Sequence, residues 1–159
     1  QRLVSVGAFE HFGKKFYKTF FKKVHNIMTD DGICLLHTIG SVDPPGPTQP
    51  FIQKRIFPGG IIPSLSDLVK PIEKTGLIIT DCETLIHHYD KTLKAWLDRF
   101  LKNKEKAKFM YNKEFVRMWE FYLASCSAAF KFRDLVVYQL QLVKSFTALP
   151  SNRRNYIYQ

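Results

Sequence analysis

The chain has 159 residues, of which 45% are hydrophobic, and its 24 lysines and arginines outnumber 14 aspartates and glutamates, for a formal net charge of +10. This length and apolar content suit one packed domain. No window approaches the roughly 18 uninterrupted apolar residues of a membrane span, and no signal-peptide pattern opens the chain, so we expect a cytoplasmic protein.

Elements expected in the first third of the chain alternate between strand and helix. Residues 2–6 predict a short buried strand, and a helix is expected from about Lys14 to Met28. Its apolar stripe recurs every four residues, at Phe16, Phe20, Val24 and Met28. The apolar run "ICLLHTI" (33–39) is typical of a strand covered on both faces. This order predicts a parallel α/β sheet.

A proline-rich loop over 40–50 follows, at the end of a strand where open α/β sheets keep their ligands. One or two helical turns are expected over 51–57. A helix capped by Ser64 or Ser66 should then run to about Lys74.

The remaining expected elements are a strand over 77–82, two long helices and a last strand. The first helix begins near Asp90 and has an apolar stripe of Leu93, Trp96, Leu97, Phe100 and Leu101. The second covers about 112–130 and carries Phe115, Met118, Trp119, Tyr122, Cys126 and Phe130. Such stripes are far more often core than a cofactor site. The alternating, β-branched run over 135–146 predicts the last strand.

The cysteines do not form a recognisable framework. Cys34, Cys82 and Cys126 are far apart, odd in number and without a CxxC pair, which predicts reduced, mostly buried thiols. His87 and His88 have no second ligand at metal spacing, so no metal site is expected. The positive charge permits an anionic partner such as nucleic acid, an acidic protein or a lipid surface. Because no zinc-finger or RRM pattern occurs, nucleic acid is not the expected partner.

The expected sheet is incomplete. It has about four strands, and the outer edge of the first would expose unpaired backbone groups. If this is a nucleotide-binding α/β fold, its first strands and glycine-rich turn are missing, because no GxGxxG or P-loop pattern occurs. We therefore expect the C-terminal portion of something larger. We divide residues 1–149 into strand and helix 1–40, proline-rich loop 40–50, helix and strand 51–83, long helices 90–131 and last strand 134–146, with a tail over 150–159.

Five segments together resemble the cyclopropane-fatty-acyl-phospholipid synthases, including the mycolic acid cyclopropane synthases. They are "SVGAFEHFG" (5–13), "LLHTIG" (35–40), "IFPGGIIPSL" (56–65), "HYDKTLKAW" (88–96) and "FVRMWEFYLASCSAAF" (115–130). The resemblance implies a class I, Rossmann-like methyltransferase fold, α/β, whose fourth to seventh strands lie in this chain. It also implies that S-adenosylmethionine, bound largely outside this chain, supplies a methylene to a cis double bond of a phospholipid acyl chain. A bound bicarbonate then acts as the base. Relatives that add a methyl branch share these motifs.

Site residues follow from the resemblance by position. Glu10, His37 and Tyr89 match catalytic residues of the family, and with the backbone of Ile39 they match its bicarbonate site. His11 is a weaker match to a cofactor contact. None of the three cysteines can be assigned to the family's further site cysteine.

Each of these residues also has a purely structural interpretation. Glu10 would then accept backbone N–H bonds at a helix mouth, His37 would be a satisfied core histidine, and Tyr89 would cap the following helix. His11 would simply pack. For the whole chain, the alternative to an enzyme is a truncated non-catalytic remnant or a lipid-binding module.

The expected partners follow from the same resemblance. They are unsaturated phospholipid acyl chains at an anionic membrane surface, on its inner face, and the missing N-terminal half of the fold. A homodimer stays open. The aromatic helices over 90–131 are expected to wall the acyl pocket, with the loop over 40–50 as a lid or membrane-facing loop.

Overall fold

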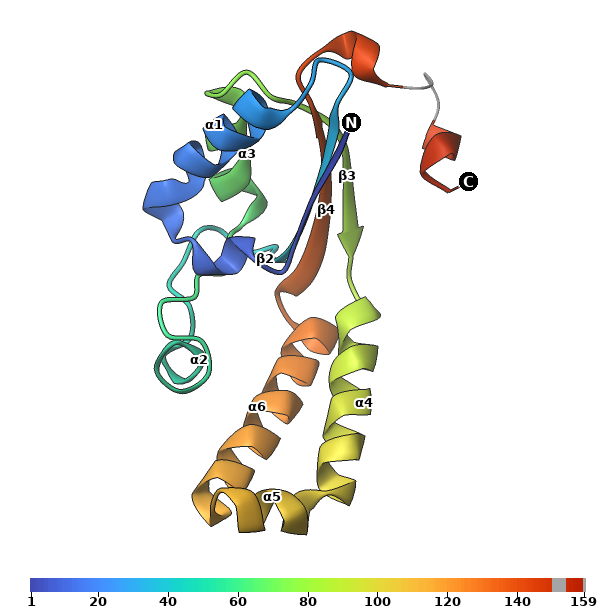
Figure 1. Cartoon of the computed structure of the whole chain (residues 1–159). Coiled ribbons are helices and arrows are strands. Elements are labelled where there is room, and N and C mark those ends of the chain that lie inside the picture. The colour runs from blue at the N-terminus through green and yellow to red at the C-terminus, as the bar shows by residue number, and fades with distance from the viewer. Residues whose placement is uncertain (150–153, 159) are drawn as a thin grey trace.

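A computed structural model describes residues 1–149 and 154–158 (Figure 1). The expected tail over 150–159 therefore lies partly outside the described residues. The strands and longer helices are β1 Arg2–Val6, α1 Tyr17–Ile27, β2 Ile33–Ser41, α2 Pro50–Arg55, α3 Leu65–Glu73, β3 Ile78–Leu85, α4 His88–Lys102, α5 Lys104–Met110, α6 Lys113–Phe132 and β4 Leu135–Val143. Short 3-10 helices cover Phe9–His11, Lys14–Phe16, Phe146–Ala148 and Arg154–Ile157.

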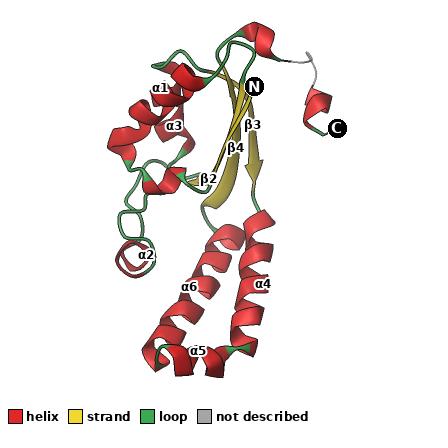
Figure 2. Cartoon of the chain, viewed as in Figure 1, coloured by secondary structure: helices red, strands yellow, loops and turns green. Residues whose placement is uncertain are grey.

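The four strands form one sheet in the order β1-β2-β4-β3 (Figure 2). β1 pairs with β2 in parallel, whereas β4 is antiparallel to both β2 and β3. The last strand is therefore antiparallel and lies between two earlier strands of a mixed α/β sheet with flanking helices, and the predicted fold class is confirmed. β4 ends at Val143, earlier than predicted, because the chain turns into a 3-10 helix at Phe146.

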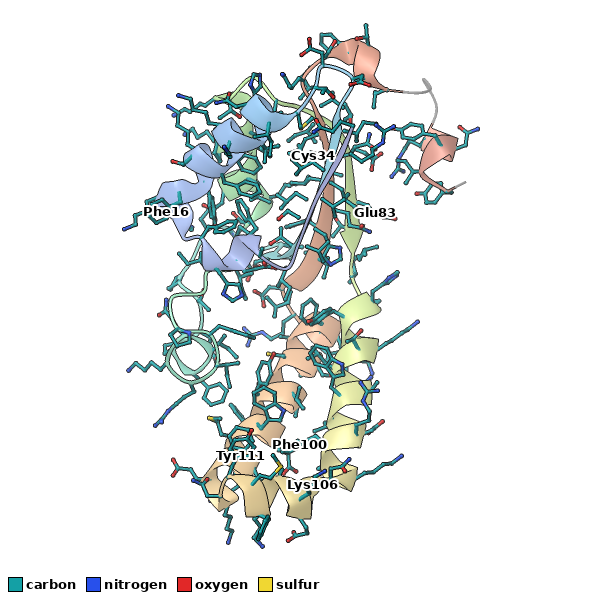
Figure 3. All side chains as sticks on the ribbon, viewed as in Figure 1. Phe16, Cys34, Glu83, Phe100, Lys106 and Tyr111 are labelled. Carbon is teal, nitrogen blue, oxygen red and sulfur yellow. The ribbon has the colours of Figure 1, made fainter. Side chains whose placement is uncertain are left out.

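Helices α1 and α3 cover one face of the sheet (Figure 2). Alternate residues of β2 and β4 enter this core, among them Cys34, Leu36, Leu140 and Leu142, all with fully buried side chains. Cys34 lies between the sheet and α1, whereas Glu83 points to the opposite side (Figure 3). The side chain of Ser64 caps α3 in a capping box with Asp67, which decides between the two predicted caps.

The first strand differs from its prediction. Val4 and Val6 are 62% and 61% exposed, so β1 is not buried on both faces. It lies at the edge of the sheet, and the described helices cover only the face that carries Leu3. The prediction failed because burial of an edge strand depends on elements that pack beside it.

The α4–α6 hairpin, defined as α4, α5 and α6, projects beyond one end of the sheet (Figure 1). α4 and α6 pack against each other around Leu93, Leu123 and Phe130. The hydroxyl of Ser127 donates to Asp90 Oδ1 at 2.5 Å and ties the two helices where the hairpin leaves the sheet. The sequence predicted two long helices here but not the short α5 between them.

The cysteines are free, as expected, but differ in burial. Cys34 is buried, Cys126 is partly exposed and Cys82 is exposed, so the expectation of mostly buried thiols holds for Cys34 alone. Within residues 1–149 and 154–158 there is no cluster of potential metal ligands and no helix long and apolar enough to cross a membrane.

Candidate active site

Glu10 is placed by the turn that ends β1. Gly7 takes a φ of 62°, which glycine adopts without the strain that a side chain would bring, and the chain then enters the 3-10 helix Phe9–His11. The ring of Phe9 is fully buried, with its centroid 4.3 Å from that of Tyr17 and 5.5 Å from that of Phe21. This packing fixes the next residue, Glu10, at the end of the sheet.

The end of β1 also leaves a backbone N–H of β2 free to bind Glu10. The N–H of Gly7 donates to the carbonyl of His37, and β1 then leaves the sheet. In a parallel pair, the N–H of Ile39 would meet the next carbonyl of β1. Glu10 Oε1 accepts from this N–H instead, at 2.6 Å. The Glu10 carboxylate thus takes the place of the β1 carbonyl as the acceptor for the N–H of Ile39.

The other carboxylate oxygen of Glu10 has no partner. Glu10 is 9% exposed, and its Oε2 is buried without a hydrogen bond to any described residue. A buried carboxylate oxygen without a donor is unfavourable by a few kcal/mol. The site is therefore suited to a ligand that donates a hydrogen bond to Oε2.

All five sequence-predicted site residues line one cavity of about 330 Å³. They are Glu10, His11, His37, Ile39 and Tyr89. The walls are mainly apolar and come from α2, the segment after it, α4, α6 and the start of β4. They include Ile52, Phe57, Ile61, Ile62, Leu93, Phe130 and Leu135. Residues from distant parts of the sequence thus form an apolar chamber with a carboxylate at its sheet end.

Tyr89 lies in the first turn of α4, where its ring centroid is 4.9 Å from that of Phe130 and 6.1 Å from that of Trp96. The N-cap position of α4 is His87, so the capping interpretation of Tyr89 is not supported. Burial, and next the charge of Glu10, raise the pKa of the Tyr89 hydroxyl. Tyr89 therefore keeps its proton at neutral pH and can donate into the cavity.

The two histidines differ in their surroundings. His37 is half-buried on β2, level with Val6 and Gln139 of the neighbouring strands. Its ring makes no hydrogen bond to another described residue, which does not favour the satisfied-core interpretation. His11 is exposed, and its ring meets that of Phe57 edge-on at 5.8 Å. It lies at the rim of the cavity.

Sequence reasoning missed two polar side chains of α6, Tyr122 and Cys126, which also line the cavity. Burial raises the pKa of Cys126 to about 11, so this thiol is neutral. Burial likewise raises the pKa of Tyr122. Both belong to the stripe that was predicted as core. The usable signal was that polar groups recur within that stripe at helical spacing.

The family model described as mycolic acid cyclopropane synthetase matches residues 1–140. The chain belongs to this family. A cyclopropane-fatty-acyl-phospholipid synthase of Escherichia coli (strain K12) is 40% identical over 139 residues, which are 87% of this chain and 36% of that enzyme. The cyclopropane mycolic acid synthase MmaA2 of Mycobacterium tuberculosis (strain H37Rv) is 34% identical over 156 residues, covering 90% of this chain and 54% of the relative.

Solved structures of this family agree with the fold. MmaA2 from M. tuberculosis superposes with a TM-score of 0.81 at 32% identity, covering 89% of this chain and 54% of that one. The synthase CmaA1, in complex with S-adenosylhomocysteine (SAH) and CTAB, gives the same TM-score, identity and coverage. This cyclopropane synthetase family chain therefore has the C-terminal portion of an S-adenosylmethionine-dependent methyltransferase fold, and it spans about a third to a half of its relatives' length.

Proposed function

We propose that the chain supplies the lipid-binding half and the base site of an S-adenosylmethionine-dependent cyclopropane synthase that acts on cis double bonds of phospholipid acyl chains. The observation that carries this proposal is the buried, unpartnered Oε2 of Glu10 at the end of an apolar cavity. An apolar chamber suits an acyl chain, and a single carboxylate within it suits proton removal from a carbon that bears developing positive charge.

The residues at the sheet end of the cavity fit a bound bicarbonate, which would supply the base. Glu10 Oε2 would accept from its O–H, and Tyr89 and His37, which line the same cavity, would donate to its other oxygens. The N–H of Ile39 already donates to Glu10 Oε1. We therefore propose that Ile39 acts by holding Glu10 in this orientation.

S-adenosylmethionine would supply the methyl group. The sequence contains no glycine-rich cofactor turn, and His11 at the rim is the proposed contact from this chain. We propose that the N-terminal half of the fold packs beside β1, where Val4 and Val6 are exposed.

We further propose that the protein is cytoplasmic and binds peripherally to the inner face of an anionic membrane. The net charge of +10 supports this, because each lysine or arginine near such a surface contributes about 1 kcal/mol. Co-sedimentation with vesicles should increase with the anionic lipid fraction and decrease with salt. Binding that is insensitive to both would contradict the proposal.

The decisive experiment for the activity is fatty-acid analysis of cells that express the complete reading frame. We expect unsaturated phospholipid acyl chains to gain one methylene, and NMR of the product to distinguish a ring from a methyl branch. The alternative is a non-catalytic remnant or lipid-binding module. Folded protein that binds lipid but leaves the fatty acids unchanged would establish that alternative.

A further inference from the structure

A second hollow lies beside the active cavity, between α2 and α6. We call it the α2–α6 groove. It has a volume of about 920 Å³, and its apolar lining is Phe51, Met118 and Phe121. The rings of Phe51 and Phe121 meet edge-on at 4.9 Å, yet Phe121 stays 54% exposed. Side chains of α2 reach toward α6 across this space (Figure 3).

The groove is also cationic. Arg55, Lys113 and Arg117 line it, against the single carboxylate of Glu114. Lys113 and Arg117 are spaced i, i+4 on α6, where like charges repel each other. Within residues 1–149 and 154–158, none of the three cations lies within 4.0 Å of a carboxylate oxygen. Three exposed cations without a carboxylate partner among the described residues leave this groove able to bind an anion.

The α2–α6 groove and the candidate cavity are lined by neighbouring residues of the same two helices. On α2, Phe51 lines the groove and the next residue, Ile52, lines the cavity. On α6, Phe121 lines the groove and the next residue, Tyr122, lines the cavity. From Lys113 to Tyr122 the helix rises about 14 Å. A ligand that fills both spaces is anionic at one end and apolar over a long stretch.

We propose that the α2–α6 groove binds the phosphodiester headgroup of the phospholipid whose acyl chain enters the active cavity. Arg55 and Arg117 can each bind phosphate oxygens through paired N–H groups, and Lys113 adds a point charge. The exposed Phe121 packs against the first methylenes of the chain. This inference rests on the proposed function, because it assumes an acyl chain in the cavity.

The test compares two lipids that differ only at the headgroup. Phosphatidylglycerol and diacylglycerol with the same brominated acyl chains are dispersed in neutral detergent micelles. Their binding to the protein from the complete reading frame is followed by quenching of tryptophan fluorescence, since Trp119 lies beside the cavity residue Tyr122. We expect the wild type to bind the phospholipid about tenfold more tightly, as three partly exposed ionic contacts would give.

The variant Arg55→Gln, Lys113→Gln, Arg117→Gln should lose this preference and keep its affinity for diacylglycerol. A charge-matched control, Arg99→Gln, Lys102→Gln, Lys106→Gln, removes three exposed cations of α4 and α5 and should keep the preference. The proposal is overturned if the wild type shows no preference, if the groove variant retains it, or if the control loses it equally. Competition by millimolar inorganic phosphate alone would also overturn it, since the groove would then be a free-phosphate site.

Turnover separates this inference from the proposed function. A preference for the headgroup without methyl transfer would support the proposed headgroup site and refute the proposed enzymatic function. Methyl transfer without a headgroup preference would support the enzymatic function and refute the headgroup site.

Discussion

Replacing Glu10 with glutamine changes the carboxylate oxygen Oε2, on which the proposed mechanism depends, into an NH₂ group. The amide oxygen can still accept from the N–H of Ile39, now 2.6 Å from Oε1. The NH₂ group takes the place of Oε2, so an acceptor becomes a donor. The shape and volume of the side chain stay the same.

The expected loss follows from this exchange. A hydrogen bond to a charged group contributes about 1.5 to 3 kcal/mol, which corresponds to roughly 10- to 150-fold in kcat/KM. The folded protein should lose little stability, because the substitution exchanges a buried charged oxygen without a partner among the described residues for an uncharged NH₂ group at the same position. Activity and stability should therefore change independently.

The assay is transfer of a labelled methyl group from S-adenosylmethionine to unsaturated phospholipid vesicles by the protein from the complete reading frame, with thermal unfolding measured alongside. Glu73→Gln, on the exposed end of α3, is the matched control and should behave as wild type. Glu10→Gln protein that is folded and retains full kcat/KM would refute the role of Oε2. A large fall in Tm would show that Glu10 is mainly structural.

Three further substitutions test neighbouring features. Tyr89→Phe keeps the packing on Phe130 but removes the donor, and we expect a loss of about tenfold or more in kcat/KM with an unchanged Tm. The hydroxyl of Tyr17 is buried without a described partner, so Tyr17→Phe should be neutral or stabilise by about 1 kcal/mol in urea unfolding. Burial raises the pKa of Tyr17 above its ordinary 10.0, so the unfolded chain loses this proton first, and stability should fall above pH 10 less steeply in the variant than in the wild type. An added Cβ at Gly40 would lie 2.3 Å from the ring of Tyr138, so Gly40→Ala should destabilise by about 1 to 3 kcal/mol, and a second change, Tyr138→Leu, should restore part of the loss.

The local patterns predicted the elements well because periodicity and turn chemistry are local. The run over 33–39 became β2, and the stripe from Leu93 became α4. Glu10, His37 and Tyr89, which the motifs singled out, line one cavity although they are up to 79 positions apart. Only the resemblance supplied that grouping, since spacing alone left each residue with a structural interpretation.

What could not be predicted depends on contacts between distant segments. The bond from Ile39 to Glu10 exists because β1 ends at Val6, opposite His37, and so does not reach Ile39, which is a matter of register. The cavity position of Cys126 depends on which side of α6 faces the sheet end. The α2–α6 groove requires a six-residue helix to dock beside one that starts far along the chain.

The early end of β1 makes strand length a component of the candidate active site. Between Val6 and Phe9 the chain has two residues, and this spacer decides whether Ile39 offers its N–H to a carboxylate or to a strand carbonyl. One residue inserted into this spacer would keep every motif residue in the sequence and still move Glu10 away from the N–H of Ile39. A relative that keeps all the site residues but has a longer spacer would then lack the hydrogen bond that orients the carboxylate.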